Sequence, residues 1–226
     1  MKVRVCGPEL ACDGIIAGMR YALVVLMLLA PAAGCGAGGS WESEAVILGA
    51  LLLTDSESAE FVRKNNDYSP AQSLMDRVSD TFSPGKLLNG TLLASQLTKD
   101  REKQTTYKLA ATAALETGII TGLLKEATDR RRPFEKDALE EDPDFPSEFD
   151  SFPSGHSSAA FAVFTVLAEQ DPENRRLYKG IAITVAVSRV YLEKHYISDV
   201  VAGALIGEFV ARYTVRHKRG LLNWRF

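Results

Sequence analysis

Apolar residues recur at helical spacing from about residue 44 to residue 216, and no alternating strand pattern persists in this part of the chain. Residues that favour helix starts and ends divide the pattern into segments. The pattern therefore predicts helices over 44–53, 55–65, 70–81, 85–98, 101–128, 154–168, 173–190 and 197–216.

Three short motifs mark expected helix starts. Thr54-Asp55-Ser56-Glu57 has the form of a capping box, in which the first and last side chains satisfy backbone N–H groups. Ser69-Pro70 and Ser83-Pro84 each place a capping residue before a first-turn proline. The capping box predicts a break between one helix that ends near residue 53 and another that begins at 55.

The most apolar stretches, 109–124, 158–168 and 200–211, are too short or too interrupted to span a bilayer, and they suit the core of a helical bundle. In the segment 101–128 the expected buried face consists of apolar residues at helical spacing. These are Leu109, Ala113, Leu115, Ile119, Ile120 and Leu123. The predicted fold class is an all-α helical bundle.

Composition narrows the functional classes. The chain has 226 residues, of which 46% are hydrophobic and 24% charged, which suits one globular domain without disulfide bonds. The formal net charge of −3 supplies no global positive field, so a nucleic-acid partner is not expected.

The N-terminal region has the form of a targeting segment. From Met19 a basic start leads into a short apolar stretch and small residues that end at Cys35. This resembles a bacterial lipobox, in which the cysteine becomes the lipidated first residue of the mature chain. Plain secretion and an uncleaved anchor remain alternatives, and Met19 is a candidate for the true initiator.

The expected organisation is a signal peptide over 1–34, a lipidated Cys35 with a flexible tether over 35–43, and a catalytic domain over 44–226. Cys6 and Cys12 would be removed with the leader, so no disulfide is expected. Such a domain would sit close to a membrane without entering it.

An acidic segment interrupts the helical pattern between Phe134 and Phe152. It holds eight carboxylates against one lysine, which predicts a loop. The loop is either a solvated connection or a lid or cation-attracting rim beside an active site.

Three segments carry candidate chemistry when they are taken together. They are Lys125 followed by Arg132-Pro133, then Pro153-Ser154-Gly155-His156, then Ser188-Arg189 followed by His195 and Asp199. Taken singly, the first could be the cationic end of a helix and the second a turn or a helix start.

Together these segments supply what phosphoryl transfer without a metal requires. Lys125, Arg132 and Arg189 can surround the nonbridging oxygens of a phosphate, and arginine can do so bidentately. Ser154 and Gly155 lie where a helix should begin, where N–H groups bind anions. No metal or other cofactor is expected.

Two of the chain's three histidines, His156 and His195, fall in these segments and remain for the roles of nucleophile and acid. Asp199 follows His195 by one helical turn and can hold one imidazole nitrogen so that the other attacks. His217, among basic residues, is expected at a helix surface.

At these positions the sequence resembles the phosphatidic acid phosphatase type 2 superfamily, which includes bacterial acid phosphatases and lipid phosphatases and shares its site with vanadium haloperoxidases. The resemblance implies the all-α core of that superfamily, and it implies a role for each motif residue. Lys125, Arg132, Arg189, Ser154 and Gly155 would hold phosphate, His195 would attack phosphorus, His156 would protonate the leaving oxygen, and Asp199 would orient His195. Arg130 and Arg131 do not match the motif spacing and are expected to be surface charges.

The expected function is metal-independent hydrolysis of phosphomonoesters or lipid phosphates and diphosphates through a phosphohistidine. The expected partners are a phosphorylated small molecule or lipid and, through the N-terminal anchor, a membrane. The expected location is the bacterial cell envelope, facing the periplasm or exterior, or else the soluble periplasmic or secreted fraction. A vanadium-dependent haloperoxidase and a noncatalytic anion-binding envelope lipoprotein remain the alternatives.

Overall fold

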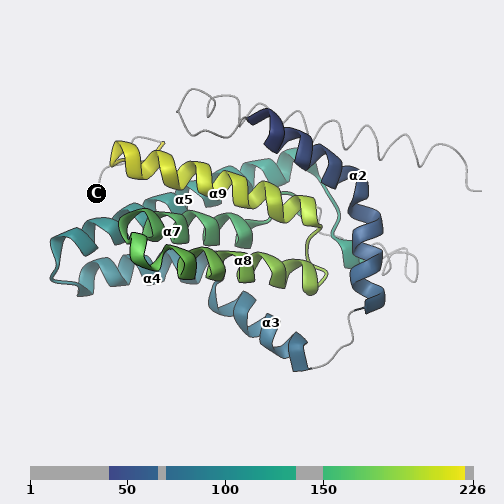
Figure 1. Cartoon of the computed structure of the whole chain (residues 1–226), viewed down its shortest axis with the longest axis horizontal. Helices are drawn as coiled ribbons and strands as arrows, with labels where there is room; N and C mark the ends of the chain where they lie inside the picture. The colour runs from purple at the N-terminus through teal and green to yellow at the C-terminus, as the bar shows by residue number, and fades with distance from the viewer. Residues whose placement is uncertain (1–40, 66–69, 136–149, 222–226) are drawn as a thin grey trace, which may run out of the picture. The chain divides into compact units, whose positions relative to one another are not determined.

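A computed structural model describes residues 41–65, 70–135 and 150–221 (Figure 1). Two compact units divide the chain between Thr54 and Asp55. The predicted leader, Cys35 and most of the tether lie outside the described residues, as do residues 136–149 of the acidic segment. These expectations therefore stay predictions.

The described residues form helices and no strand. They are α2 (Trp41–Asn65), α3 (Pro70–Thr81), α4 (Pro84–Leu97), α5 (Arg101–Thr128), α7 (Gly155–Gln170), the short 3₁₀ helix η2 (Pro172–Asn174), α8 (Arg175–Tyr191) and α9 (Ile197–His217). The predicted all-α class is confirmed. From α3 onward the observed helix ends lie within two residues of those predicted from capping residues and periodicity.

The predicted break at residue 54 is wrong, because α2 runs without interruption through this position. The Thr54 hydroxyl donates to the carbonyls of Ala50 and Leu51 inside the helix rather than capping a new one. The Asp55 carboxylate instead accepts a hydrogen bond from the N–H of Ser198, in the first turn of α9. The Asp55 side chain therefore makes a tertiary contact with α9 instead of the helix cap that the local motif predicts.

Helix α7 is the centre of the Asp55–Phe226 unit and packs against α5, α8 and α9 (Figure 1). Its contact with α9 is built from small residues. A Cβ added at Gly203 would lie 2.5 Å from the carbonyl oxygen of Ser154, and one added at Gly207 would meet the Ser158 carbonyl even more closely. The two backbones can approach this closely only because glycine has no side chain.

The predicted buried face of α5 is wrong in part. Ile119 and Leu123 are 38% and 64% exposed, although Leu109 and Ala113 are buried as expected. The buried face instead carries small and polar residues. They are Ala110, Ala111, Thr112, Ala114, Glu116, Thr117 and Thr121. Close helix packing favours short side chains, and each of the buried threonine hydroxyls can donate to a carbonyl one turn back.

Buried Glu116 is the exception among these short side chains. Its carboxylate accepts a hydrogen bond from the Leu221 N–H and lies beside Gly220, just beyond the C-terminal end of α9.

None of the helices within the described ranges has both the length and the hydropathy needed to cross a membrane.

Candidate active site

The candidate residues come from four helix ends that lie at the same end of the bundle in Figure 1. Lys125 is in the last turn of α5, His156 is in the first turn of α7, Arg189 is in the last turn of α8, and Asp199 is in the first turn of α9. His195 lies in the turn between α8 and α9. The charges of Lys125, Arg189 and His195 all act on the pKa of His156, so these groups share one cluster.

His195 is buried, and its ring orientation is fixed by the main chain. Its Nδ1 lies 2.7 Å from the carbonyl oxygen of Ser151, which can only accept a hydrogen bond. Nδ1 therefore carries the proton in the neutral ring, and Nε2 keeps the lone pair that a nucleophile needs. Burial is the main cause that lowers the pKa of His195, and it keeps the ring neutral.

Asp199 is held close to His195 without a direct hydrogen bond to it. Its Oδ2 is 3.7 Å from His195 Nδ1 and accepts instead from the Ser151 hydroxyl at 2.6 Å and the Tyr196 N–H at 2.8 Å. The carboxylate thus acts on the imidazole through its charge and through Ser151, which contacts both groups. Burial opposes ionisation of Asp199, but the charge of Arg130 and the nearby His195 hold its pKa below the usual range.

Two of the three predicted phosphate-binding cations, Arg132 and Lys125, contact Asp150. Arg132 makes a bidentate ion pair with it, through Nε at 2.6 Å and Nη2 at 2.7 Å. Lys125 donates to the Asp150 main-chain carbonyl and lies 3.6 Å from its carboxylate. Asp150, near the end of the acidic segment, is thus held by both of these cations.

Arg189 is buried and forms a hydrogen bond with α3. Its Nη1 donates to the hydroxyl of Ser79 in α3, while Nε has no hydrogen-bond partner within the part of the chain that the structure describes. Burial and the charge of Arg132 lower the pKa of Arg189 to about 10. A buried guanidinium with an unused donor suits an anionic ligand.

His156 is half-buried among these cations. Burial first, then the charges of Arg189 and other neighbouring cations, lower its pKa to about 3. The ring is therefore neutral in the ligand-free site above that pH. A bound phosphate would oppose the cations and raise this pKa, so the ring would gain a proton together with the anion.

Ser154 is the N-cap of α7, and its backbone N–H is used within the protein. Its N–H donates to the Asp199 carbonyl at 2.9 Å, and its hydroxyl caps α7 by accepting from the Ser157 N–H. Helix geometry leaves the N–H groups of Gly155 and His156 without partners inside α7. The first turn thus offers these two backbone donors to an anion.

The expectation that Arg130 is a surface charge is wrong. Its side chain is only 13% exposed and pairs with two buried carboxylates, Asp55 and Asp199. In the sequence Arg130 is one of three adjacent arginines, and no local signal separates it from them. Arg131 is exposed as expected, and His217 lies exposed at the end of α9, stacked on Tyr213.

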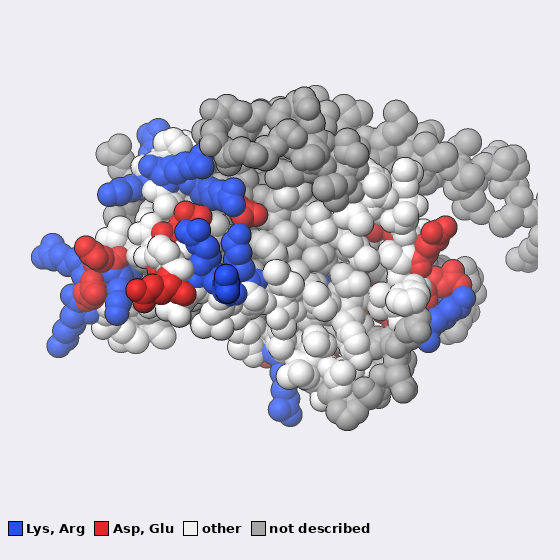
Figure 2. Space-filling view, in the orientation of Figure 1, with Lys and Arg blue, Asp and Glu red and all other residues white. Residues whose placement is uncertain are grey.

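Much of the positive surface charge on the face drawn in Figure 2 lies at the other end of the bundle. Figure 2 shows lysine and arginine side chains gathered over the end of the bundle where α9 ends and α8 begins, opposite to the candidate site. The site's own cations are largely buried. Its positive character therefore comes from groups that are largely removed from water.

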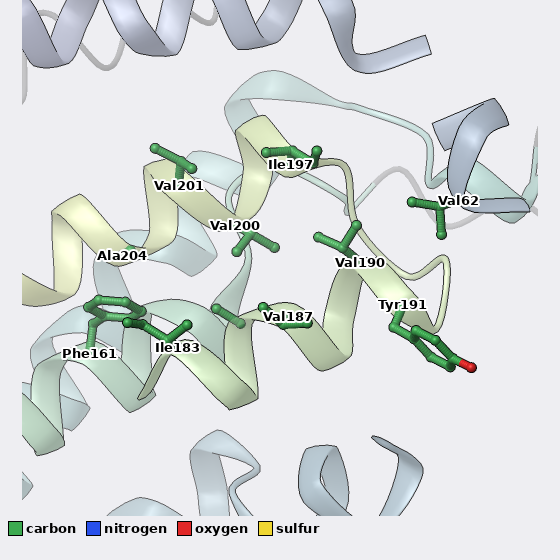
Figure 3. Close-up of a pocket in the computed structure, with 11 residues that line it drawn as sticks. Val62, Phe161, Ile183, Val187, Val190, Tyr191, Ile197, Val200, Val201 and Ala204 are labelled. Atoms are coloured by element: carbon green, nitrogen blue, oxygen red, sulfur yellow. The ribbon is translucent and has the colours of Figure 1, made fainter. Parts of the chain in front are cut away.

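An apolar groove of about 430 Å³ lies between α8 and α9 (Figure 3). Val190 and Val200 line it, and they directly follow Arg189 and Asp199 in the chain. Successive helical residues point about 100° apart, so the groove opens on another face of α8 and α9 than the one that carries the charged residues.

Comparison with known proteins agrees with this geometry. The model of the PAP2 (phosphatidic acid phosphatase type 2) superfamily matches residues 106–220, about half of the chain. The chain belongs to the PAP2 superfamily. The matched region contains every charged and histidine residue of the candidate site.

Two bacterial phosphatases are similar to part of the chain. The lipid A 1-phosphatase of Rhizobium johnstonii is 37% identical over 101 residues, which are 43% of this chain and 41% of that protein. Phosphatidylglycerophosphatase B of Bacillus subtilis is 34% identical over 100 residues, or 39% of this chain and 46% of that one. The matches thus span less than half the length of these relatives.

A solved PAP2 structure shares the fold. The crystal structure of a transmembrane PAP2 type phosphatidylglycerolphosphate phosphatase from Bacillus subtilis superposes with a TM-score of 0.55 at 20% identity. The superposition covers 90% of this chain and 94% of that one. At this identity the likeness concerns the fold alone.

Proposed function

We propose that this PAP2 protein is a metal-independent phosphatase that hydrolyses phosphate groups on lipids or small molecules through a phosphohistidine at His195. The observation that carries the proposal is the state of His195. It is buried, its Nδ1 is bound to the Ser151 carbonyl, and its Nε2 keeps the lone pair. A neutral imidazole held in one tautomer beside three cations is suited to attack phosphorus.

In the first step Nε2 of His195 forms a bond to phosphorus while the bond from phosphorus to the leaving oxygen breaks. The charge on the nonbridging oxygens is stabilised by Lys125, Arg132 and Arg189. For this, the phosphate oxygens replace the Asp150 carboxylate as the partner of Arg132. His156, once protonated with the substrate bound, gives its proton to the leaving oxygen.

In the second step water attacks phosphorus and the bond to Nε2 breaks, which restores His195 and releases inorganic phosphate. His156 accepts a proton from the attacking water, so the protons balance over the cycle. The site's own cations offset the phosphate charge in both steps.

Lipid phosphates are the proposed substrate class because the named relatives act on lipids. The test is hydrolysis of p-nitrophenyl phosphate and of a panel of lipid and soluble phosphates by the purified full chain with EDTA present. His195→Ala should abolish turnover, whereas His217→Ala, at an exposed helix end, should keep it. Full activity of His195→Ala would refute the assignment.

A trapping experiment separates the chemical routes. Brief mixing with ³²P-labelled substrate and acid quench should leave an acid-labile, base-stable label on the wild type and none on His195→Ala. Bromide oxidation with vanadate and peroxide, without phosphate release, would instead favour the haloperoxidase alternative.

We also propose that Cys35 is lipidated and holds the enzyme at the outer face of a bacterial membrane. The support is the apolar stretch and small residues before Cys35. Cys35→Ser should move the protein to the soluble fraction and leave hydrolysis of soluble phosphomonoesters unchanged, which cell fractionation and mass analysis of the N-terminus would measure. An unlipidated mature chain that begins elsewhere would overturn this proposal.

A further inference from the structure

The Arg130 guanidinium joins two buried carboxylates that come from distant parts of the sequence. Its Nη1 lies 2.5 Å from Asp199 Oδ1 and 2.8 Å from the Ser198 hydroxyl, and its Nη2 lies 2.6 Å from Asp55 Oδ2. Its Cζ lies 4.2 Å from the centre of the Tyr196 ring, within the range of a cation–π contact. Arg130 is thus held by Asp55 of α2 and by residues at the start of α9.

Asp55 completes this network from α2. Its carboxylate accepts hydrogen bonds from the N–H and the hydroxyl of Ser198, in addition to the ion pair with Arg130. Asp55 is 2% exposed and Asp199 is fully buried. Two carboxylates so far from water need a partner of opposite charge, and Arg130 pairs with both.

The network reaches His195 through Ser151. The Ser151 N–H donates to the Arg130 carbonyl at 2.8 Å, its hydroxyl donates to Asp199, and its carbonyl accepts from His195 Nδ1. A change at Arg130 therefore acts on the two groups that orient the imidazole. The pairs that Asp150 makes with the phosphate-binding cations involve other side chains.

We propose that Arg130, anchored by Asp55, is a positioning residue that fixes Asp199 and Ser151 and thereby aims the His195 ring at phosphorus. This inference rests on the proposed function, in which His195 is the nucleophile. Arg130 does not contact the phosphate. Its removal should therefore slow the chemical step and leave anion binding to Lys125, Arg132 and Arg189 in place.

The test compares Arg130→Gln with Arg131→Gln, a matched change at the adjacent exposed arginine. With p-nitrophenyl phosphate, Arg130→Gln should lower kcat on the order of 10- to 100-fold, a loss comparable to that on removing the hydrogen-bond partner of a metal ligand. Its KM and its inhibition constant for orthovanadate should change by no more than roughly threefold. Arg131→Gln should match the wild type in all three.

Two further variants test the network itself. Arg130→Lys keeps the charge without the fork that spans both carboxylates, so kcat should recover in part. Asp55→Asn should lower kcat by a smaller factor than Arg130→Gln, and the double variant should lose less than the product of the two losses, because both changes act on one unit.

The outcomes are distinct. If His195→Ala stays active, the proposed function fails. If His195→Ala is inactive but Arg130→Gln behaves like Arg131→Gln, only the positioning role is overturned. An Arg130→Gln protein that loses orthovanadate binding as well as kcat would indicate a structural role, which also overturns the proposal. If Arg130→Gln does not fold, the same two measurements are made on Arg130→Lys and Asp55→Asn. A lower kcat with an unchanged inhibition constant for orthovanadate supports the positioning role, and any other result overturns it.

Discussion

Replacement of Gly203 by alanine tests the close contact between α7 and α9. The added Cβ would lie 2.5 Å from the Ser154 carbonyl oxygen, against the ordinary contact distance of at least 3.4 Å, so one backbone must move by about 0.9 Å. Overpacking of this kind costs about 1–3 kcal/mol. Alanine in place of glycine inside a helix recovers about 0.5–1 kcal/mol.

The net expectation for Gly203→Ala is a loss of about 1 kcal/mol in the free energy of unfolding, which corresponds to a Tm lower by roughly 2–4 °C in a domain of this size. Thermal unfolding followed by circular dichroism measures it. Gly180→Ala in α8 is the control, because a Cβ there meets nothing within 4 Å. This control should match the wild type or exceed its Tm.

The same substitution should also lower activity at temperatures where the protein is folded. Ser154 leads directly into Gly155 and His156, so displacement of its carbonyl moves the first turn of α7. Gly207→Ala has a similar clash one turn further along α9, at Ser158, and should destabilise with a smaller loss of activity. A Gly203→Ala protein as stable as Gly180→Ala would refute the close approach of the two helices.

Three more predictions concern charge in the site. Asp150→Asn removes the carboxylate that pairs with Arg132 and Lys125, so both cations are available to orthovanadate, which should inhibit more strongly. Weaker inhibition would show instead that Asp150 holds these cations in place for the ligand. Phosphate binding near pH 5 should be accompanied by proton uptake, because the ligand-free pKa of His156 is about 3 and a bound anion raises this pKa. Calorimetry in buffers of different ionisation enthalpy would detect the uptake. Its absence in the wild type would contradict the role of His156 as proton donor. Asp199→Asn should keep residual turnover that His195→Ala lacks, since the Ser151 carbonyl still orients the ring, and equal losses would contradict this.

The helices could be predicted from the sequence because capping residues and periodicity are local. Pro70 and Pro84, each preceded by a serine, mark helix starts that the structure confirms. Local signals could not show that the helix continues through Thr54. The Asp55 side chain binds Ser198, 143 positions away, and no local motif indicates such a contact. Ile119 and Leu123 were assigned to the core by hydrophobicity, whereas the observed contacts of α5 select short side chains.

In the candidate site, too, the sequence motifs predict some features, while others depend on contacts between distant residues. His156, His195 and the three motif cations lie within electrostatic reach of one another, as the motif spacing suggested. Arg130 has the same type and charge as its neighbours, and only its place after α5 distinguishes it. Asp129 ends that helix in a left-handed conformation (φ 48°), and Arg130 then enters the interior. Such a turn depends on the folded chain and has no clear signature in one sequence.

The hydrogen bond from His195 to the Ser151 carbonyl has a consequence for variation among relatives. A side-chain acceptor can be lost in one codon change, whereas a peptide oxygen is present whatever residue stands at that position. The path of the backbone after the acidic segment thus determines which nitrogen of His195 keeps its lone pair. Substitutions at Ser151 can tune how Asp199 is held, but a different tautomer would require that stretch of backbone to be rerouted.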